Sequence, residues 1–278
     1  MADVATDRVA PAIFISHGAG PMPLLNPASD PNHGPTRTFF EQVAPQWLGL
    51  HDPATKPAAI VLVTAHWEEN VVNISSGTSH ELYFDYYGFP RPAYSVRYDA
   101  PGSPELAEKI KLLLTEANIE AQLNPKRGWD HGVFVPMKLI HPSADVPIVQ
   151  VSLARSLDPQ LHFRIGQALA QLRQDNIAIV GSGMSFHGGR GSSQVKNHSK
   201  NFLLALSGAC SKTSVEERGE ALKGWASMPY ARECHPREEH LIPLHVVAGA
   251  AGEGRVKTHD IKSASSEITI RCFGWGQP

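Results

Sequence analysis

The chain has 278 residues and a formal net charge of −2 at pH 7, and 42% of its residues are hydrophobic while 19% are charged. This length and composition exclude a disordered chain and suit a large α/β domain with a substantial core. The near-balanced charge argues against a surface that binds nucleic acid. No apolar run approaches the roughly 20 residues that span a bilayer, and residues 1–11 do not resemble a secretory signal.

The cysteines Cys210, Cys234 and Cys272 are far apart in the sequence and odd in number. This spacing favours a reducing compartment over a disulfide framework. We therefore expect a cytoplasmic protein whose partners are small molecules, with neither nucleic acid nor a membrane among them.

The first predicted element is a buried strand within Pro11–Leu25, where an apolar run ends at His17 and passes into glycines and prolines. Residues 19–35 are dense in Gly, Pro, Asn and Asp, which predicts a long irregular loop. Thr36–Leu48 predicts a helix with an apolar stripe, and Pro45 is expected to kink it or end it early.

A second continuous apolar run, Pro57–Glu68, predicts a buried strand that carries His66 at its carboxyl end. Residues 71–76 predict a short strand. The segment 82–104 is rich in Tyr, Phe, Pro and Gly, and two interpretations fit it equally. Its rings either cover a small-molecule pocket or simply cover an edge of the sheet.

Ser103 predicts a helix N-cap, with Pro104 at the first helical position. Further along, Arg127–Met137 is predicted to place Asp130 and His131 in a turn before an apolar stretch. Asp130 either orients His131 or is only a turn residue.

Val146–Leu153 predicts another buried strand, and residues 158–174 predict a capped helix. Ile177–Arg190 then predicts a third strand of the first type, with His187 in the loop beyond it. Ser199–Cys210 is predicted to be helical.

The charged stretch Lys212–Lys223 predicts a solvated helix or loop. In Cys234–Leu244 we expect Pro236 to begin a helix, with His240 one turn in and directly before a strongly apolar sequence. Glu267–Trp275 predicts a late strand that adds at an edge of the sheet.

Strands and helices alternate with short connections along the chain. This alternation predicts an α/β fold, with residues 1–278 forming a single domain around a central mixed, largely parallel sheet that helices flank on both faces. Open α/β sheets place their chemistry outside the carboxyl ends of the strands. The histidines that follow these strands are therefore expected to share one site.

Neutral imidazole is the commonest protein ligand for divalent metals, and a catalytic metal site needs three protein ligands and an open position. We predict His17, His66 and His240 as metal ligands, with His187 as a fourth ligand or an acid/base group. The spacing forms no compact metal motif. The alternative is therefore that these histidines are helix caps and hydrogen-bonding groups of the core.

Five separated histidine motifs together resemble the class III extradiol ring-cleavage dioxygenase family, and in particular its DOPA 4,5-dioxygenase branch. The motifs are SHGAGPMPLL with His17, VTAHWE with His66, WDHGVFVPM with His131, GSGMSFH with His187 and HPREEHLIPL with His240. They span residues 11–250 in the family's order, which makes the set far more specific than any single motif.

The resemblance implies a non-haem Fe(II) enzyme that uses O2 to open a catechol ring beside, rather than between, its two hydroxyls. DOPA or a related catecholic compound is the implied substrate. Position by position, His17, His66 and His240 match the metal ligands, and His131 and His187 match acid/base histidines that flank the substrate. In some relatives the position of His187 contacts a zinc ion, so both roles stay open for it.

One position departs from the wider family, whose better-known members complete a triad of two histidines and one carboxylate. Here the third ligand is His240, as in the DOPA branch, and its neighbour Glu239 is an alternative ligand. Three neutral ligands leave the full 2+ charge of the ion, which favours a doubly anionic catecholate but also suits Zn(II).

Two other functions are compatible with the same pocket. One is a zinc-dependent hydrolase, since three histidines around Zn(II) also activate water. The other is a non-enzymatic binding module on this fold. In either enzyme, Arg155, Arg190 and Arg237 are candidates for holding a substrate carboxylate.

Overall fold

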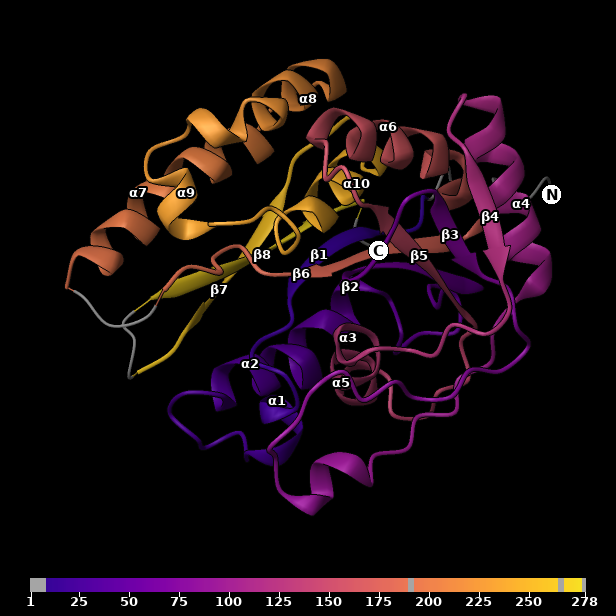
Figure 1. Ribbon diagram of the computed structural model, residues 1–278, viewed down its shortest axis with the longest axis horizontal. Coiled ribbons are helices and arrows are strands. Elements are labelled where there is room, and N and C mark those ends of the chain that lie inside the picture. Colours follow the sequence, from indigo (N-terminus) through magenta and orange to yellow (C-terminus); the bar gives the residue numbers. More distant parts are fainter. Residues whose placement is uncertain (1–8, 190–192, 265–267, 277–278) are drawn as a thin grey trace, which may run out of the picture.

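The computed structural model describes residues 9–189, 193–264 and 268–276. Within these residues, eight strands form one mixed sheet in the order β4-β3-β5-β2-β6-β1-β8-β7. Helices lie on both faces of this sheet (Figure 1). The predicted α/β fold class, with a mixed central sheet between helices, is confirmed.

The bounds of the strands and helices follow the chain order. The strands are β1 Ala12–Ser16, β2 Ala59–Glu69, β3 Val72–Ser75, β4 Ala121–Asn124, β5 Ile148–Ala154, β6 Ile177–Gly183, β7 Lys257–Lys262 and β8 Thr269–Trp275. The α-helices are α1 Met22–Leu25, α2 Gly34–Thr38, α3 Ala44–Trp47, α4 Pro104–Glu116, α5 His131–Ile140, α6 Pro159–Leu169, α7 Ser193–Cys210, α8 Val215–Lys223, α9 Ala231–Cys234 and α10 Ile242–Ala250. In the part of the chain that the structure describes, no helix has the length and apolar character needed to cross a membrane.

The four central strands β5, β2, β6 and β1 are parallel to one another, so their carboxyl ends lie at one edge of the sheet. Successive side chains of a strand point to opposite faces. Phe14 and Val61 accordingly pack into the core beneath α4, α6, α7, α8 and α10, whereas Ile13 and Ile60 pack into the core beneath α3 and α5. This double burial explains why these strands are continuously apolar in sequence.

The C-terminal strand β8 differs from its predicted place at an edge. It lies inside the sheet, antiparallel to β1 on one side and to β7 on the other. Strand β7, KTHDIK, carries no apolar pattern that predicts a strand, because Ile261 is its one buried side chain. The predicted strand began at Glu267, which lies outside the described residues.

The two predicted N-terminal elements need correction. Residues 19–35 are not wholly irregular, because they contain α1 and the start of α2. The predicted helix over 36–48 does run through Pro45, which has no N–H to donate. A π-helical segment, Phe39–Val43, precedes Pro45 and widens the backbone there, so the chain stays helical into α3.

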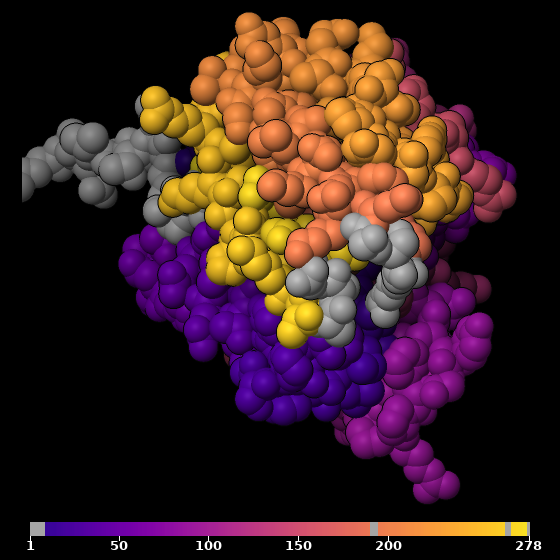
Figure 2. Space-filling model, turned by 90° about the vertical axis from the view of Figure 1, so that its left-hand side faces the viewer, coloured from indigo at the N-terminus to yellow at the C-terminus, as the bar shows by residue number. Residues whose placement is uncertain are grey.

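The C-terminal strands connect both halves of the molecule. β7 contacts α2, and β8 contacts α7. Figure 2 shows this side: the yellow C-terminal strands lie between the indigo N-terminal segment and the orange helices. The edge of the sheet is thus covered by elements that are far apart in sequence.

Helices α6 and α10 approach each other closely through two glycines. A Cβ added to Gly166 would overlap the backbone oxygen of Val246, and a Cβ added to Gly249 would overlap the backbone oxygen of Phe163. Because backbone atoms occupy both positions, neither side can yield by rotating a side chain. The pair sets the distance of α10 from α6, and α10 directly follows the segment that carries His240.

We predict that Gly249→Ala lowers the free energy of unfolding by about 1–3 kcal/mol, because the added methyl group forces the two helices apart. Gly208→Ala is the matched control: Gly208 is also helical, but a Cβ there meets no heavy atom within 4 Å. The control should raise the free energy of unfolding by up to about 1 kcal/mol. Urea unfolding of both variants measures the difference, and equal stabilities would contradict the helix contact.

Candidate metal centre

Four of the five predicted histidines come from the carboxyl edge of the central strands and from the helix and loop that close over it. His17 directly follows β1, and its backbone N–H donates to Gly183 at the end of β6. His66 lies inside β2, not at its end, where the pairing with β5 shifts register between Val63 and Glu68. Such an irregularity redirects a side chain out of the regular alternation.

His131 and His240 come from α5 and from the segment before α10. His131 is the first residue of α5, so the predicted turn is in fact a helix start with Asp130 as its N-cap. His240 precedes α10, which begins at Ile242, so the predicted helix start at Pro236 is wrong. Pro243 lies in the first turn of α10 and takes the role that the sequence suggested for Pro236.

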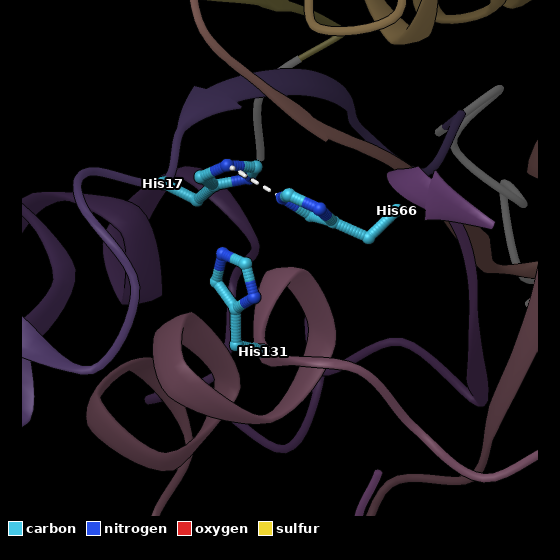
Figure 3. A group of neighbouring side chains, drawn as sticks. All are labelled: His17, His66 and His131. Carbon is cyan, nitrogen blue, oxygen red and sulfur yellow. Dashed lines mark hydrogen bonds between the residues drawn. The ribbon is translucent and has the colours of Figure 1, made fainter. Parts of the chain in front are cut away.

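The structure brings the rings of these four histidines together. The ring centroid of His66 lies 5.0 Å from that of His17, 4.0 Å from that of His131 and 5.0 Å from that of His240. The rings of His17 and His240 are 5.3 Å apart. Figure 3 shows His17, His66 and His131 pointing toward one another from three different elements.

Hydrogen bonds fix which nitrogen of His17 faces the cluster. Ser182 Oγ donates its single proton to the backbone oxygen of Gly132 at 2.5 Å. It therefore accepts from Nδ1–H of His17, which is 2.9 Å away. The Nε2 atom of His17 is left with a lone pair, and it lies 3.3 Å from Nε2 of His66.

Two carboxylates orient the other rings in the same way. Asp85 Oδ1 is 2.9 Å from Nδ1 of His131 and also accepts from the His131 backbone N–H at 3.0 Å. Glu239 Oε1 is 2.9 Å from Nδ1 of His240. A carboxylate on Nδ1 leaves Nε2 free as a ligand and raises its basicity.

The charge states follow from burial. Burial, followed by the neighbouring imidazoles, lowers the pKa of His17 and of His66 well below its ordinary value, so both rings are neutral at pH 7. Burial acts to raise the pKa of Glu239, but the hydrogen bond and the electrostatic interaction with His240 bring it down to about 2. Burial also acts to raise the pKa of Asp85, but the hydrogen bonds from His131 bring it below its ordinary value.

These nitrogens fit a divalent ion. Two imidazole nitrogens at about 2.1 Å from one ion, with an angle of about 90–110° between them, lie about 3.0–3.4 Å apart. The 3.3 Å between the Nε2 atoms of His17 and His66 falls in this range. Ligand atoms within 4.8 Å of one another form two groups: one contains His17, His66 and His131, and the other contains His187, Glu239 and His240. The predicted ligand set takes members from both groups.

His187 joins the second group from the loop after β6, as predicted. Its ring stacks on that of His240 with centroids 3.5 Å apart and an interplanar angle of 17°. Its side chain is 45% exposed and lies 3.6 Å from Glu239 Oε1. Of the five histidines, His187 is therefore the one most open to an incoming molecule.

The residue that orients His131 was missed by the sequence analysis. Asp130 does not contact its ring: it caps α5 and accepts hydrogen bonds from Thr64 and Gln150, and burial raises its pKa. Asp85 takes the orienting role. It stands alone as an acid within the aromatic segment 82–96, and that isolated charge was the signal available in the sequence.

The aromatic segment does lie beside the site. The ring of Tyr86 is 5.9 Å from that of His131, and Phe84 and Tyr86 both pack against Phe134 of α5. These contacts favour the interpretation that the segment covers a pocket rather than an edge of the sheet.

Of the arginine candidates, Arg237 is paired with carboxylates. Arg237 forms two hydrogen bonds of 2.5 Å with the carboxylate of Glu68 and lies 3.4 Å from Glu239. It links the end of β2 to the residue that holds His240, which explains its position without a substrate. Arg190 lies outside the described residues.

The fold and the buried histidines define a metal-dependent α/β enzyme, and comparisons with known proteins agree. Residues 11–271 match the family described as the catalytic LigB subunit of aromatic ring-opening dioxygenase. The chain is 43% identical to the dioxygenase tasH of Hapsidospora irregularis, covering 96% of this chain and 86% of that protein. It is 35% identical to the 4,5-DOPA dioxygenase extradiol of Beta vulgaris, covering 89% of each chain.

The fold is also similar to that of a solved structure. The crystal structure of an uncharacterised protein from Escherichia coli K12 superimposes with a TM-score of 0.74 at 25% identity, over 96% of this chain and 99% of that one. The chain therefore belongs to the LigB family of aromatic ring-opening dioxygenases. Members of this family are metal-dependent, and the histidine cluster is suited to hold the metal.

We predict that Glu239→Gln weakens metal binding about 10–100-fold, because the amide holds Nδ1–H of His240 less strongly than the carboxylate does. Glu238→Gln is the matched control, since Glu238 is the adjacent acid and bonds with Arg232 instead. Competition with a chromogenic chelator measures both affinities. Equal affinities in the two variants would contradict the orienting role of Glu239.

Proposed function

We propose that this protein is a non-haem Fe(II) dioxygenase that opens the ring of a catechol beside its two hydroxyls and incorporates both atoms of O2 into the product. The observation that carries the proposal is the convergence of buried imidazoles whose Nδ1 atoms are already bonded, in a chain of the LigB family. The substrate is a catechol, as the names of the DOPA dioxygenase relatives suggest. The proposal treats residues 1–278 as one catalytic domain.

Within this proposal His17, His66 and His240 hold the metal. Each comes from a different part of the chain, and their ring centroids lie 5.0–5.3 Å apart, which supports a shared ion. Fe(II) bound there supplies open coordination positions for a catechol and O2 and conducts electron density between them. Since the three ligands are neutral, the site favours a substrate that arrives with, or acquires, negative charge.

His131 takes the role of base. A catechol must lose its hydroxyl protons as it binds, and Nε2 of His131 faces the cluster with a lone pair while its Nδ1–H is held by Asp85. The Asp85 carboxylate stabilises the imidazolium that forms. Asp85 is a positioning residue, because it acts through His131.

His187 takes the role of acid. It is the most exposed of the five rings, and it stands beside His240 on the open side of the cluster. From there it is able to donate a proton as the O–O bond breaks and to recover one from solvent. Tyr86, beside His131, helps to keep water away from the ring that receives the phenolic proton.

A zinc-dependent hydrolase remains the second candidate, because three histidines also form a catalytic Zn(II) site in which water becomes the nucleophile. The two functions differ in their dependence on O2. The first experiment loads the protein with Fe(II) without oxygen and then adds O2 and a panel of catechols. We expect a yellow ring-opened semialdehyde and one O2 consumed per catechol, whereas the Zn(II)-loaded protein should consume none. Equal O2 uptake with both metals, or none with either, would overturn the proposal.

The assignment of ligands and bases gives a separate prediction. His240→Gln should lose most of the bound metal and with it the activity. His131→Gln should retain close to one metal per chain and lose kcat by about 10²–10⁴-fold, the usual contribution of general acid/base catalysis. Metal analysis after gel filtration, paired with O2 uptake, separates the two. Loss of metal from the His131 variant would instead place His131 in the ligand set.

Asp85→Asn tests the positioning role. The amide keeps an acceptor for Nδ1–H of His131 but carries no charge, so the imidazolium is less stable and the base weaker. We expect kcat to fall at least about tenfold while KM changes little and the metal content stays the same. Asp99→Asn, at an exposed acid just after the aromatic segment 82–96, is the control and should behave as the unaltered protein. A fall in metal content alone would show that Asp85 acts on the ligands instead.

A further inference from the structure

A cavity of ≈ 670 Å³ adjoins the metal centre. His187 lines it and stacks on His240, and Gly18, which directly follows His17, lines it as well. The cavity therefore opens from the histidine that is most exposed. Its volume lies in the range of sites that hold drug-sized ligands, so a bare catechol ring leaves much of it unfilled.

The far wall of the cavity is apolar and belongs to the β7–β8 hairpin. Ile261 and Ile270 face each other across the two antiparallel strands, and Ile268, just before β8, lines the same cavity. Ile261 and Ile268 are 3% and 8% exposed. Phe186 and Met184, from the segment before His187, add further apolar surface. Figure 2 views the molecule from the side on which this hairpin lies.

Within the described ranges no Asp, Glu, Lys or Arg lines the cavity, and its titratable side chains there are His33 and His187. Asp260 and Arg271 of the hairpin pair with each other on the opposite face. Polar atoms do occur on the wall toward α2. There the Ser263 hydroxyl donates to Asn32, so these two side chains bond within the wall.

From these observations we infer that the catechol accepted by this chain carries an uncharged, largely hydrophobic substituent several carbons long, which occupies the isoleucine-lined cavity. The inference rests on the proposed catechol cleavage and specifies its substrate class. An amino-acid substituent would bring an ammonium and a carboxylate against the isoleucine side chains, at the cost of their hydration. An alkyl or similar neutral group instead gains affinity from each buried carbon.

The first test measures binding without turnover. Isothermal titration calorimetry on the Fe(II)-loaded protein under anaerobic conditions compares catechol, 4-butylcatechol and DOPA. The butyl and amino-acid substituents of the last two compounds occupy the same ring position. Each buried methylene contributes about fourfold in affinity. We therefore expect 4-butylcatechol to bind at least about tenfold more tightly than catechol, and DOPA to bind no more tightly than catechol. DOPA binding as tightly as 4-butylcatechol would overturn the inference.

The second test asks whether the hairpin is responsible. Ile270→Thr keeps the β-branched shape but places a hydroxyl on the wall, and it should reduce the preference for 4-butylcatechol over catechol about three- to fivefold. Ile268→Val, which removes one methyl group, is the milder variant should Ile270→Thr not fold. Leu204→Thr, at an exposed position of α7, is the control and should keep the full preference. An unchanged preference in both cavity variants would contradict the inference.

The two proposals fail in different ways. If the catechols bind in the expected order but none is cleaved with uptake of O2, the substrate class stands and the dioxygenase function falls. If catechols are cleaved but DOPA is bound and turned over best, the function stands and the inference about the cavity is wrong.

Discussion

The metal centre depends on the burial of several imidazoles whose ring nitrogens lie close together. The Nε2 atoms of His17 and His66 lie 3.3 Å apart, and His131 and His240 present the same atom nearby because their Nδ1 atoms are bonded to carboxylates. Polar ring nitrogens are costly to bury unless they are paired. A divalent cation bound between them would offset this cost.

The surrounding fold holds the imidazoles by different devices. Parallel strands deliver His17 to an edge of the sheet, and the irregular pairing of β2 turns His66 out of the core. The N-cap of α5 fixes His131. Glu239 fixes His240, and Arg237 links Glu239 to Glu68. Each histidine is therefore positioned by bonds that do not involve the metal. The site is largely formed by folding alone, which is the arrangement that rapid metal binding requires.

Much of this could be predicted from the sequence, for a physical reason. Strands buried on both faces are continuously apolar, so β1, β2, β5 and β6 were recognisable, and the Ser103 cap of α4 was recognisable from its side chain. Elements with little burial left no such signal, as β7 shows. The partner of His131 could not be found either, since Asp85 is 46 residues away and the contact depends on how the aromatic segment folds back.

The metal centre and the adjoining cavity are built from different parts of the sheet. The histidines depend on the parallel centre, whereas the isoleucine wall belongs to the antiparallel β7–β8 hairpin beside it. The side chains that face the cavity are therefore different from those that hold the metal. A substitution at an isoleucine of the wall can alter which compound fits while every predicted ligand is kept.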